Sequence, residues 1–78
     1  MKLRLFTKAA CPACRKMKSQ LAGRDFEEVY IDEPDGLAMA AFHGIMSVPV
    51  LQLLDEQGIC VKQFYRAEDI DNAALQDV

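Results

Sequence analysis

The sequence predicts one small α/β domain, residues 1–78, with the elements in the order β-α-β-α-β-β-α and four strands in one mixed sheet. Along the chain, segments in which apolar and polar residues alternate are followed by segments in which apolar residues recur at helical spacing. A tight turn joins the last two strand-like runs, which makes them antiparallel, whereas a helical crossover makes the first two parallel. A chain of 78 residues is enough for one small domain and leaves no room for a second domain with its own core. We therefore expect helices on both faces of a single four-stranded sheet.

The first strand and the first helix have clear local signals. Residues 2–7 alternate polar and apolar side chains, as a half-buried strand does. Residues 11–22 are expected to form a helix, because Pro12 suits a first helical position, where its missing N–H is not needed. Three side chains recur at helical spacing on one face of this helix: Cys14, Met17 and Leu21. Gly23 is expected to end it.

The middle of the chain predicts a second strand followed by a short helix. Residues 26–31 carry the apolar and β-branched side chains of a strand. Residues 32–36 contain three acids, a proline and a glycine in close succession, which indicates a turn. An alanine-rich segment at about residues 37–43 then predicts a helix, which Gly44 is expected to close.

The last third of the chain predicts a hairpin and a closing helix. Residues 48–54 and 59–64 are the two expected strands, and residues 55–58 are the turn between them. Residues 67–76 are expected to form the last helix, with acidic side chains near its positive end. Its inward-facing side chains are expected to be Ile70, Ala73 and Ala74.

Composition and charge exclude several classes of protein. Apolar residues make up 51% and charged residues 27% of the chain, as in an ordinary globular domain rather than a disordered one. The net charge of −3 disfavours a general nucleic-acid binder, which needs many converging lysines and arginines. No segment has the unbroken apolar run of a signal peptide or a membrane span. We expect a cytoplasmic monomer with no nucleic-acid or membrane partner.

The most informative motif is Cys11-Pro12-Ala13-Cys14, two thiols at the start of a predicted helix. Unpaired N–H groups at a helix N-terminus stabilise a thiolate, and the second thiol is close enough to form a disulfide. Cys11 is expected to point outward as the acidic nucleophile, and Cys14, one turn later, to be the buried resolving thiol. The positive charge of Lys8 further favours a thiolate at Cys11.

Two segments resemble a known family in the order that the family shows. Thr7-Lys8-Ala9-Ala10-Cys11-Pro12-Ala13-Cys14 resembles the active-site segment of glutaredoxins, with a lysine three residues before the first cysteine. Ser47-Val48-Pro49 is similar to the Thr/Ser-Val-Pro signature of the thioredoxin superfamily. The resemblance covers essentially the whole chain and implies the minimal thioredoxin fold, with the strands in the spatial order 2-1-3-4.

The resemblance also implies a substrate site around the two cysteines. Lys8 matches a lysine that contacts the carboxylate of glutathione in the family, and Pro49 matches a proline whose preceding peptide bond is cis. The backbone of Val48 would then be free to pair with an extended substrate or glutathione. The residues expected to bind substrate are Lys8, Pro12, Ala13, Val48, Pro49, Glu68 and Asp69. No metal ligands and no bound cofactor are expected.

The implied activity is the reduction of protein or mixed disulfides, including service as an electron donor to a reductase such as ribonucleotide reductase. Ala13 stands where glutaredoxins usually carry tyrosine, and Tyr65-Arg66 replace the family's glycine pair. Both changes remove features that enclose glutathione. The resemblance thus implies glutathione as a weak external reductant, or thioredoxin reductase in its place.

Other interpretations of the same cysteines remain open. Three cysteines fit a reactive pair plus a lone thiol better than a disulfide scaffold. The alternative to an enzyme is a non-catalytic binding module or a metal or iron–sulfur protein, for which Cys60 and His43 would have to supply the missing zinc ligands. Cys60 is otherwise expected to be a buried structural thiol, and His43 a helix-end residue. The basic residues Arg15, Lys16 and Lys18 form a solvated face or attract acidic partners.

Overall fold

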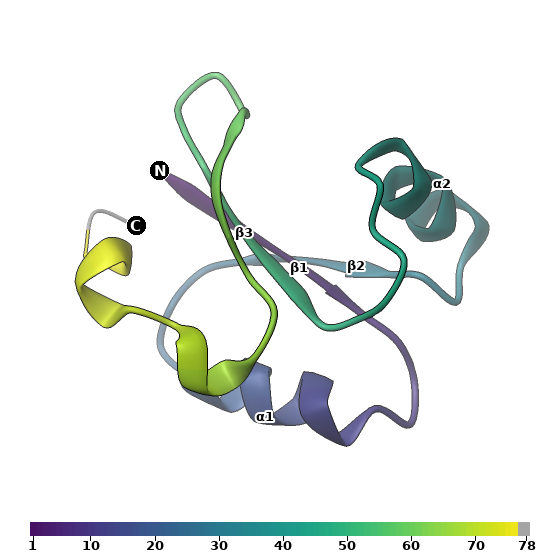
Figure 1. Cartoon of the computed structure of the whole chain (residues 1–78), viewed down its shortest axis with the longest axis horizontal. Coiled ribbons are helices and arrows are strands. Elements are labelled where there is room, and N and C mark those ends of the chain that lie inside the picture. Colours follow the sequence, from purple (N-terminus) through teal and green to yellow (C-terminus); the bar gives the residue numbers. More distant parts are fainter. Residues whose placement is uncertain (77–78) are drawn as a thin grey trace.

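A computed structural model describes residues 1–76 and has four strands in one mixed sheet, in the order β2-β1-β3-β4 (Figure 1). Residues 77 and 78, the last two of the predicted domain, lie outside the described residues. The strands are β1 (Lys2–Thr7), β2 (Glu27–Tyr30), β3 (Val50–Leu54) and β4 (Cys60–Phe64). The helices are α1 (Pro12–Gln20) and α2 (Pro34–Phe42), followed by the short 3-10 helices η1 (Ala67–Asp69) and η2 (Asn72–Leu75). The predicted fold class and strand order are confirmed.

The pairing of β1 decides where the ends of the other strands lie. β1 is parallel to β2 and antiparallel to β3, which is antiparallel to β4. Phe6, near the end of β1, pairs with Val29 on one side and with Val50, the first residue of β3, on the other. The segment that follows β1 and the segment that precedes β3 therefore emerge at the same end of the sheet.

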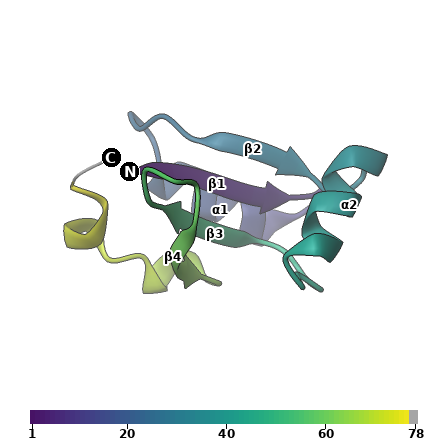
Figure 2. The ribbon, with the colours of Figure 1, turned by 90° about the horizontal axis from the view of Figure 1, so that it is seen from above.

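The two helices cover opposite faces of the sheet, because alternate residues of β1 point to opposite sides (Figures 1 and 2). Leu3 and Leu5 face α1, whereas Phe6 faces α2. The core on the α1 face consists of Leu3, Leu5, Met17, Leu21, Leu51, Leu53, Phe64, Ala67 and Leu75. The smaller core on the α2 face consists of Phe6, Val29, Ala40 and Val50. Helices on both faces are thus confirmed.

Helix α1 starts as predicted but ends earlier than predicted. Cys11 is its N-cap and Pro12 occupies the first helical position, as expected. The helix ends at Gln20, after which the backbone tightens, since the N–H of Leu21 donates to the carbonyl of Lys18 at 3.0 Å. Gly23 lies beyond the end of the helix with φ +83°, a conformation that glycine adopts readily.

Proline explains the starts of α2 and β3, whereas β2 (Glu27–Tyr30) and β4 (Cys60–Phe64) are slightly shorter than predicted. Helix α2 begins at Pro34, inside the segment predicted as a turn, because proline is preorganised for the first helical turn. Strand β3 begins at Val50 rather than at residue 48. Pro49 has no N–H to donate to a neighbouring strand, so regular pairing starts one residue later.

The predicted closing helix at residues 67–76 is wrong. The chain forms η1 and η2 instead, separated by Ile70 and Asp71 in extended conformations. The carboxylate of Asp71 accepts a hydrogen bond from the N–H of Ala73 at 3.0 Å, which starts a new turn and competes with a continuous helix. Ile70 and Ala74 do pack against the core, but Ala73 is exposed and Leu75 is the fully buried side chain.

Candidate active site

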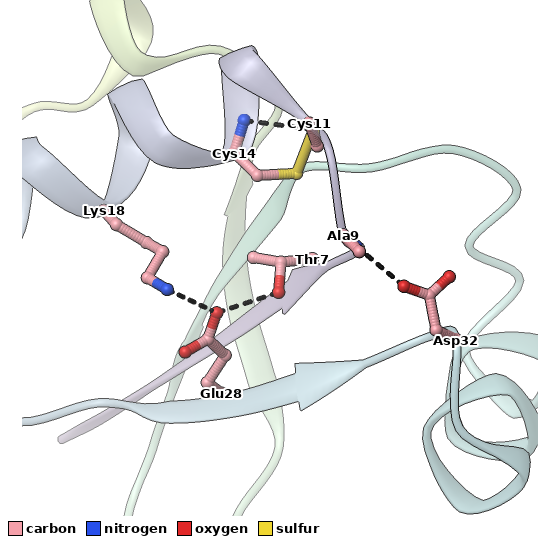
Figure 3. The surroundings of a disulfide bond; sticks show 7 residues. All are labelled: Thr7, Ala9, Cys11, Cys14, Lys18, Glu28 and Asp32. Carbon is pink, nitrogen blue, oxygen red and sulfur yellow. Dashed lines mark hydrogen bonds and ion pairs between the residues drawn. A yellow bond between two sulfur atoms is a disulfide. The ribbon is translucent and has the colours of Figure 1, made fainter.

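The two cysteines of the Cys-x-x-Cys motif form a disulfide at the N-terminus of α1 (Figure 3). Their Cα atoms are 5.2 Å apart, within the usual range for a disulfide. The backbone N–H of Cys14 donates to the Sγ atom of Cys11 over 3.1 Å, so Cys11 caps the helix through its own sulfur. The geometry places one sulfur where a helix N-terminus would stabilise a negative charge.

The expectation that Cys11 points outward is wrong for this disulfide form. Cys11 is 7% exposed and Cys14 is 2% exposed, so both are buried. The sulfur of Cys11 is turned back toward Cys14 by the disulfide and by the hydrogen bond that it accepts. The order of burial is nevertheless the predicted one, since Cys14 lies deeper than Cys11.

A loop with two hydrogen-bonded anchors carries the first cysteine. The N–H of Ala9 donates to the Oδ2 atom of Asp32 at 2.7 Å, and the N–H of Ile31 donates to the carbonyl of Thr7 at 2.9 Å. The first bond joins the loop after β1 to the segment after β2, and the second joins the last residue of β1 to that same segment. Ala10 has φ 53°, in the left-handed region, and turns the chain directly into Cys11.

The Ser47-Val48-Pro49 segment lies at the same end of the sheet as the cysteines. The Val48–Pro49 peptide bond is cis, as the resemblance implied. Pro49 is buried and Val48 is half-buried. Because Val50 pairs with Phe6, this segment enters β3 where β1 leaves the sheet toward Cys11.

A cavity of about 210 Å³ lies beside the disulfide. It is lined by Thr7, Lys8, Ala9, Ala10, Cys11, Cys14, Arg15, Lys18, Glu28 and Tyr30. Lys8, one of the predicted substrate-binding residues, lines this cavity. Three of its other side chains carry positive charge or a carboxylate: Arg15, Lys18 and Glu28.

A hydrogen-bonded cluster on the α1 face of the sheet forms part of this cavity (Figure 3). The Nζ atom of Lys18 lies 3.0 Å from the Oε2 atom of Glu28, and the hydroxyl of Thr7 donates to the same oxygen at 2.9 Å. Burial acts to raise the pKa of Glu28, but hydrogen bonds from Lys18 and Thr7, with a contribution from Tyr30, outweigh it and lower that pKa. The bond to Glu28 raises the pKa of Lys18. Both groups are therefore charged at neutral pH.

The lowered pKa of Glu28 predicts a pH-dependent contribution to stability. In the unfolded chain Glu28 takes up its proton near the usual pKa of 4.5. In the folded protein its carboxylate stays ionised to a lower pH. The ionised carboxylate thus stabilises the fold above pH 4.5, and this contribution is lost as the pH falls through the folded pKa. We expect the difference in unfolding free energy between the wild type and Glu28→Gln to shrink on acidification. Urea unfolding at several pH values measures it; a difference independent of pH would contradict the assignment.

The other predicted substrate-binding residues are more scattered. Pro12 and Ala13 are exposed in the first turn of α1. Glu68 and Asp69 are exposed on η1, which packs against α1 but does not line the cavity. The carboxylate of Asp69 is already paired with the guanidinium of Arg66, at 2.9 Å from its Nε atom.

His43 and Cys60 lie together in a different part of the molecule. Both line an open depression of about 480 Å³ that also includes Gln52 and Tyr65 and does not include the cysteine pair. Cys60 is half-buried on β4 rather than buried, and its thiol donates to the carbonyl of Lys62 at 3.3 Å. Within residues 1–76, no three histidine, cysteine or acidic side chains are grouped as a metal site would require.

Three residues of the site were not anticipated from the sequence: Thr7, Glu28 and Asp32. In the sequence, Thr7 is part of the motif segment and Asp32 is part of a turn. The available signal was the spacing of Cys14 and Lys18, which are four residues apart and thus share one face of α1. Finding Glu28 also requires the register of β2 against β1, which pairs it with Leu5.

Comparison with known proteins agrees with this geometry. The solved structure of thioredoxin 1 from Thermosipho africanus TCF52B is similar to the chain, with a TM-score of 0.68 and 21% sequence identity over 96% of this chain and 85% of that one. A thioredoxin from Thermus thermophilus has a TM-score of 0.63 and 19% identity, over 96% of this chain and 67% of that one. These likenesses establish a thioredoxin-like fold.

The described part of the chain contains no helix long and apolar enough to cross a membrane. No significant match was found among curated protein sequences. The family model described as glutaredoxin matches residues 3–59, which include the cysteine pair, the cis-proline segment and the first three strands except Lys2. The chain, with its Cys11–Cys14 redox-type pair on a thioredoxin-like fold, therefore belongs to the glutaredoxin family.

Proposed function

We propose that this protein is a dithiol oxidoreductase that reduces disulfides in proteins and mixed disulfides. The observation that carries the proposal is the position of the Cys11–Cys14 pair, which forms a disulfide across the N-terminus of α1. A thiolate at Cys11 would receive the stabilisation that the N–H of Cys14 now gives to the same sulfur. A reducing compartment such as the cytoplasm suits a pair that must be returned to the dithiol after each turnover.

The proposed reaction proceeds through one mixed disulfide. The thiolate of Cys11 attacks a sulfur of the substrate disulfide, a new S–S bond forms to Cys11, and the other substrate sulfur leaves as a thiolate that takes a proton. Cys14 then loses its proton and attacks the Sγ atom of Cys11, which releases the second substrate thiolate. The substrate gains two electrons, and the protein is left with the Cys11–Cys14 disulfide. An external thiol or flavoprotein reductant restores the dithiol.

Substrate would approach from the end of the sheet where the cysteines and the cis-proline segment lie. Lys8 lines the cavity beside the disulfide and could pair with a substrate carboxylate. We propose that the backbone of Val48 pairs with an extended segment of the substrate, with Pro49 beneath it. A protein reductase that must be reduced after each catalytic cycle, such as ribonucleotide reductase, is a suitable substrate class for this exchange.

Reduction of insulin disulfides tests the proposed activity directly. The wild-type protein, kept reduced by dithiothreitol, should accelerate insulin reduction well above the rate with dithiothreitol alone. Cys60→Ser is the matched control, because Cys60 lies on β4 outside the cavity and should not be needed. A wild-type protein that gives no acceleration would exclude the oxidoreductase function and leave a binding role.

The choice of reductant depends on the groups available to hold glutathione. Tyr65 and Arg66 stand where the family carries glycines, and Arg66 engages the Asp69 carboxylate in an ion pair on the surface. Ala13 provides no aromatic edge next to the disulfide. Each lost backbone or charge-assisted hydrogen bond to glutathione would cost roughly 1–3 kcal/mol of binding. We therefore propose that glutathione is a weak reductant here and that thioredoxin reductase is a better one.

Side-by-side turnover assays separate the two reductants. The oxidised protein should be reduced efficiently by NADPH with thioredoxin reductase, and slowly by millimolar glutathione with glutathione reductase. Both assays monitor NADPH consumption on the same insulin substrate. Fast, saturable turnover with glutathione and no response to thioredoxin reductase would reverse this assignment.

A further inference from the structure

Lys18 and Glu28 form an ion pair in the cavity that also contains the two cysteines. Lys18 follows Cys14 by one helical turn, so both side chains lie on the face of α1 that meets the sheet. Glu28 reaches the same cavity from β2, where it pairs with Leu5 of β1, whose side chain packs in the core on the α1 face. Figure 3 shows the carboxylate of Glu28 between Lys18 and Thr7, on the side of the sheet that carries the disulfide.

Positive side chains outnumber carboxylates in this cavity, and Lys18 is the cation that is paired with the carboxylate. The titratable and charged groups facing the cysteines are Lys8 from the loop after β1, Arg15 and Lys18 from α1, and Glu28 and Tyr30 from β2. Among the described residues of the cavity wall, Glu28 supplies the only carboxylate. Its side chain is 18% exposed and that of Lys18 is 39% exposed, so water screens the pair only in part.

Cations near a thiol favour its thiolate form, and a carboxylate near it disfavours that form. Lys18 alone would therefore make Cys14 more acidic, and Glu28 alone would make it less acidic. As a pair, their effects on Cys14 oppose each other. Lys8 and Arg15 have no carboxylate partner among the described residues of the cavity and remain free to act on the thiols.

We propose that the Lys18–Glu28 ion pair sets the acidity of the Cys14 thiol and the reduction potential of the Cys11–Cys14 pair. This inference rests on the proposed dithiol function and assigns its regulation to two positioning residues that need not contact substrate. Glu28 keeps the Lys18 charge from stabilising a Cys14 thiolate, so the resolving thiol stays protonated until a mixed disulfide has formed. The dithiol form is then less stabilised, which makes the protein a stronger reductant.

Charge variants at the two positions should move the thiol in opposite directions. Glu28→Gln leaves the Lys18 cation unpaired and should lower the pKa of Cys14 by about one unit, roughly a tenfold gain in thiolate below that pKa. Lys18→Met leaves the carboxylate unpaired and should raise that pKa by a similar amount. The double variant should return close to the starting value, because both charges are absent. Glutamine can still accept the Thr7 hydrogen bond, so this contact is kept.

The measurement is the rate of Cys14 alkylation by iodoacetamide against pH, in full-length protein that also carries Cys11→Ser and Cys60→Ser. Glu27→Gln is the matched control, because Glu27 is the neighbouring residue on the opposite face of β2, where it pairs with Arg4 at 2.9 Å. Urea unfolding of each variant establishes that it is folded at the pH used. If the pKa of Cys14 moved in the same direction in both single variants, or did not move in either, the proposal would be overturned.

Equilibration with a glutathione redox buffer supplies a second readout in proteins that retain all cysteines. At a pH near the pKa of Cys14, where its thiolate is populated, the fraction oxidised should fall in Glu28→Gln and rise in Lys18→Met, relative to the wild type, at one buffer composition. If the wild type reduces insulin but these fractions are equal, the tuning role is wrong and the oxidoreductase function stands. If the wild type has no insulin activity while the alkylation shifts occur, the function fails and the electrostatic coupling stands.

Discussion

Replacing Cys11 with serine is expected to reduce insulin reduction to the uncatalysed rate, whereas Cys14→Ser should still attack and then stop as a mixed disulfide. Cys11 caps α1 and is the less buried of the two cysteines, so we expect it to be the one that an external disulfide approaches. Cys14 is 2% exposed and can reach the Sγ atom of Cys11 from inside the molecule. Without Cys14, only an external thiol can release the trapped substrate.

Mass spectrometry distinguishes the two variants. Each is first incubated with a small model disulfide, such as a mixed disulfide of glutathione. Cys14→Ser should gain the mass of one substrate thiol, and peptide mapping should place it on Cys11. Cys11→Ser should gain none on Cys14 over the same time, and Cys60→Ser should behave as the wild type. Stoichiometric trapping by Cys14 in the Cys11→Ser variant would mean that the two roles are reversed.

The parts of the fold that could be predicted from sequence depend on local signals. Alternation in residues 2–7, Pro12 at a first helical position and the turn at residues 55–58 each specify one element without reference to the rest of the chain. The strand order came from the family resemblance, because periodicity does not determine which strands are neighbours. The prediction of a closing helix failed because the side chain of Asp71 accepts a hydrogen bond from the N–H of Ala73. The sequence pattern does not show whether this bond or a continuous helix forms.

The site could be predicted only as far as the motif extends. Cys11, Cys14 and Lys8 lie in one continuous segment, and the structure places them around one cavity. Glu28 and Asp32 come from other elements, and their roles depend on the register of β2 and on the start of α2. The predicted exposure of Cys11 also failed, because the disulfide and the hydrogen bond from the N–H of Cys14 turn its sulfur back toward Cys14.

Gly36 allows α2 to pack closely against the end of β2, near the segment that anchors the cysteine loop. It is buried in the first turn of α2, against the end of β2. A Cβ atom at this position would overlap the carbonyl group of Tyr30, which is backbone and cannot rotate away as a side chain can. The segment between them includes Asp32, whose carboxylate anchors the N–H of Ala9 in the loop that leads to Cys11. A displaced α2 would therefore disturb both stability and the cysteine loop.

Gly36→Ala is accordingly expected to lower the free energy of unfolding by roughly 3 kcal/mol, as overpacking against a fixed backbone does. Helix propensity alone predicts the opposite sign, a gain of about 1 kcal/mol for alanine over glycine. Ala38→Gly, at an exposed position of the same helix, is the matched control and should cost only about 1 kcal/mol. Urea unfolding of the three proteins measures these differences. If Gly36→Ala were as stable as the wild type, the close approach of α2 to Tyr30 could not exist in solution, and Asp32 would lose its assigned part in holding the cysteine loop.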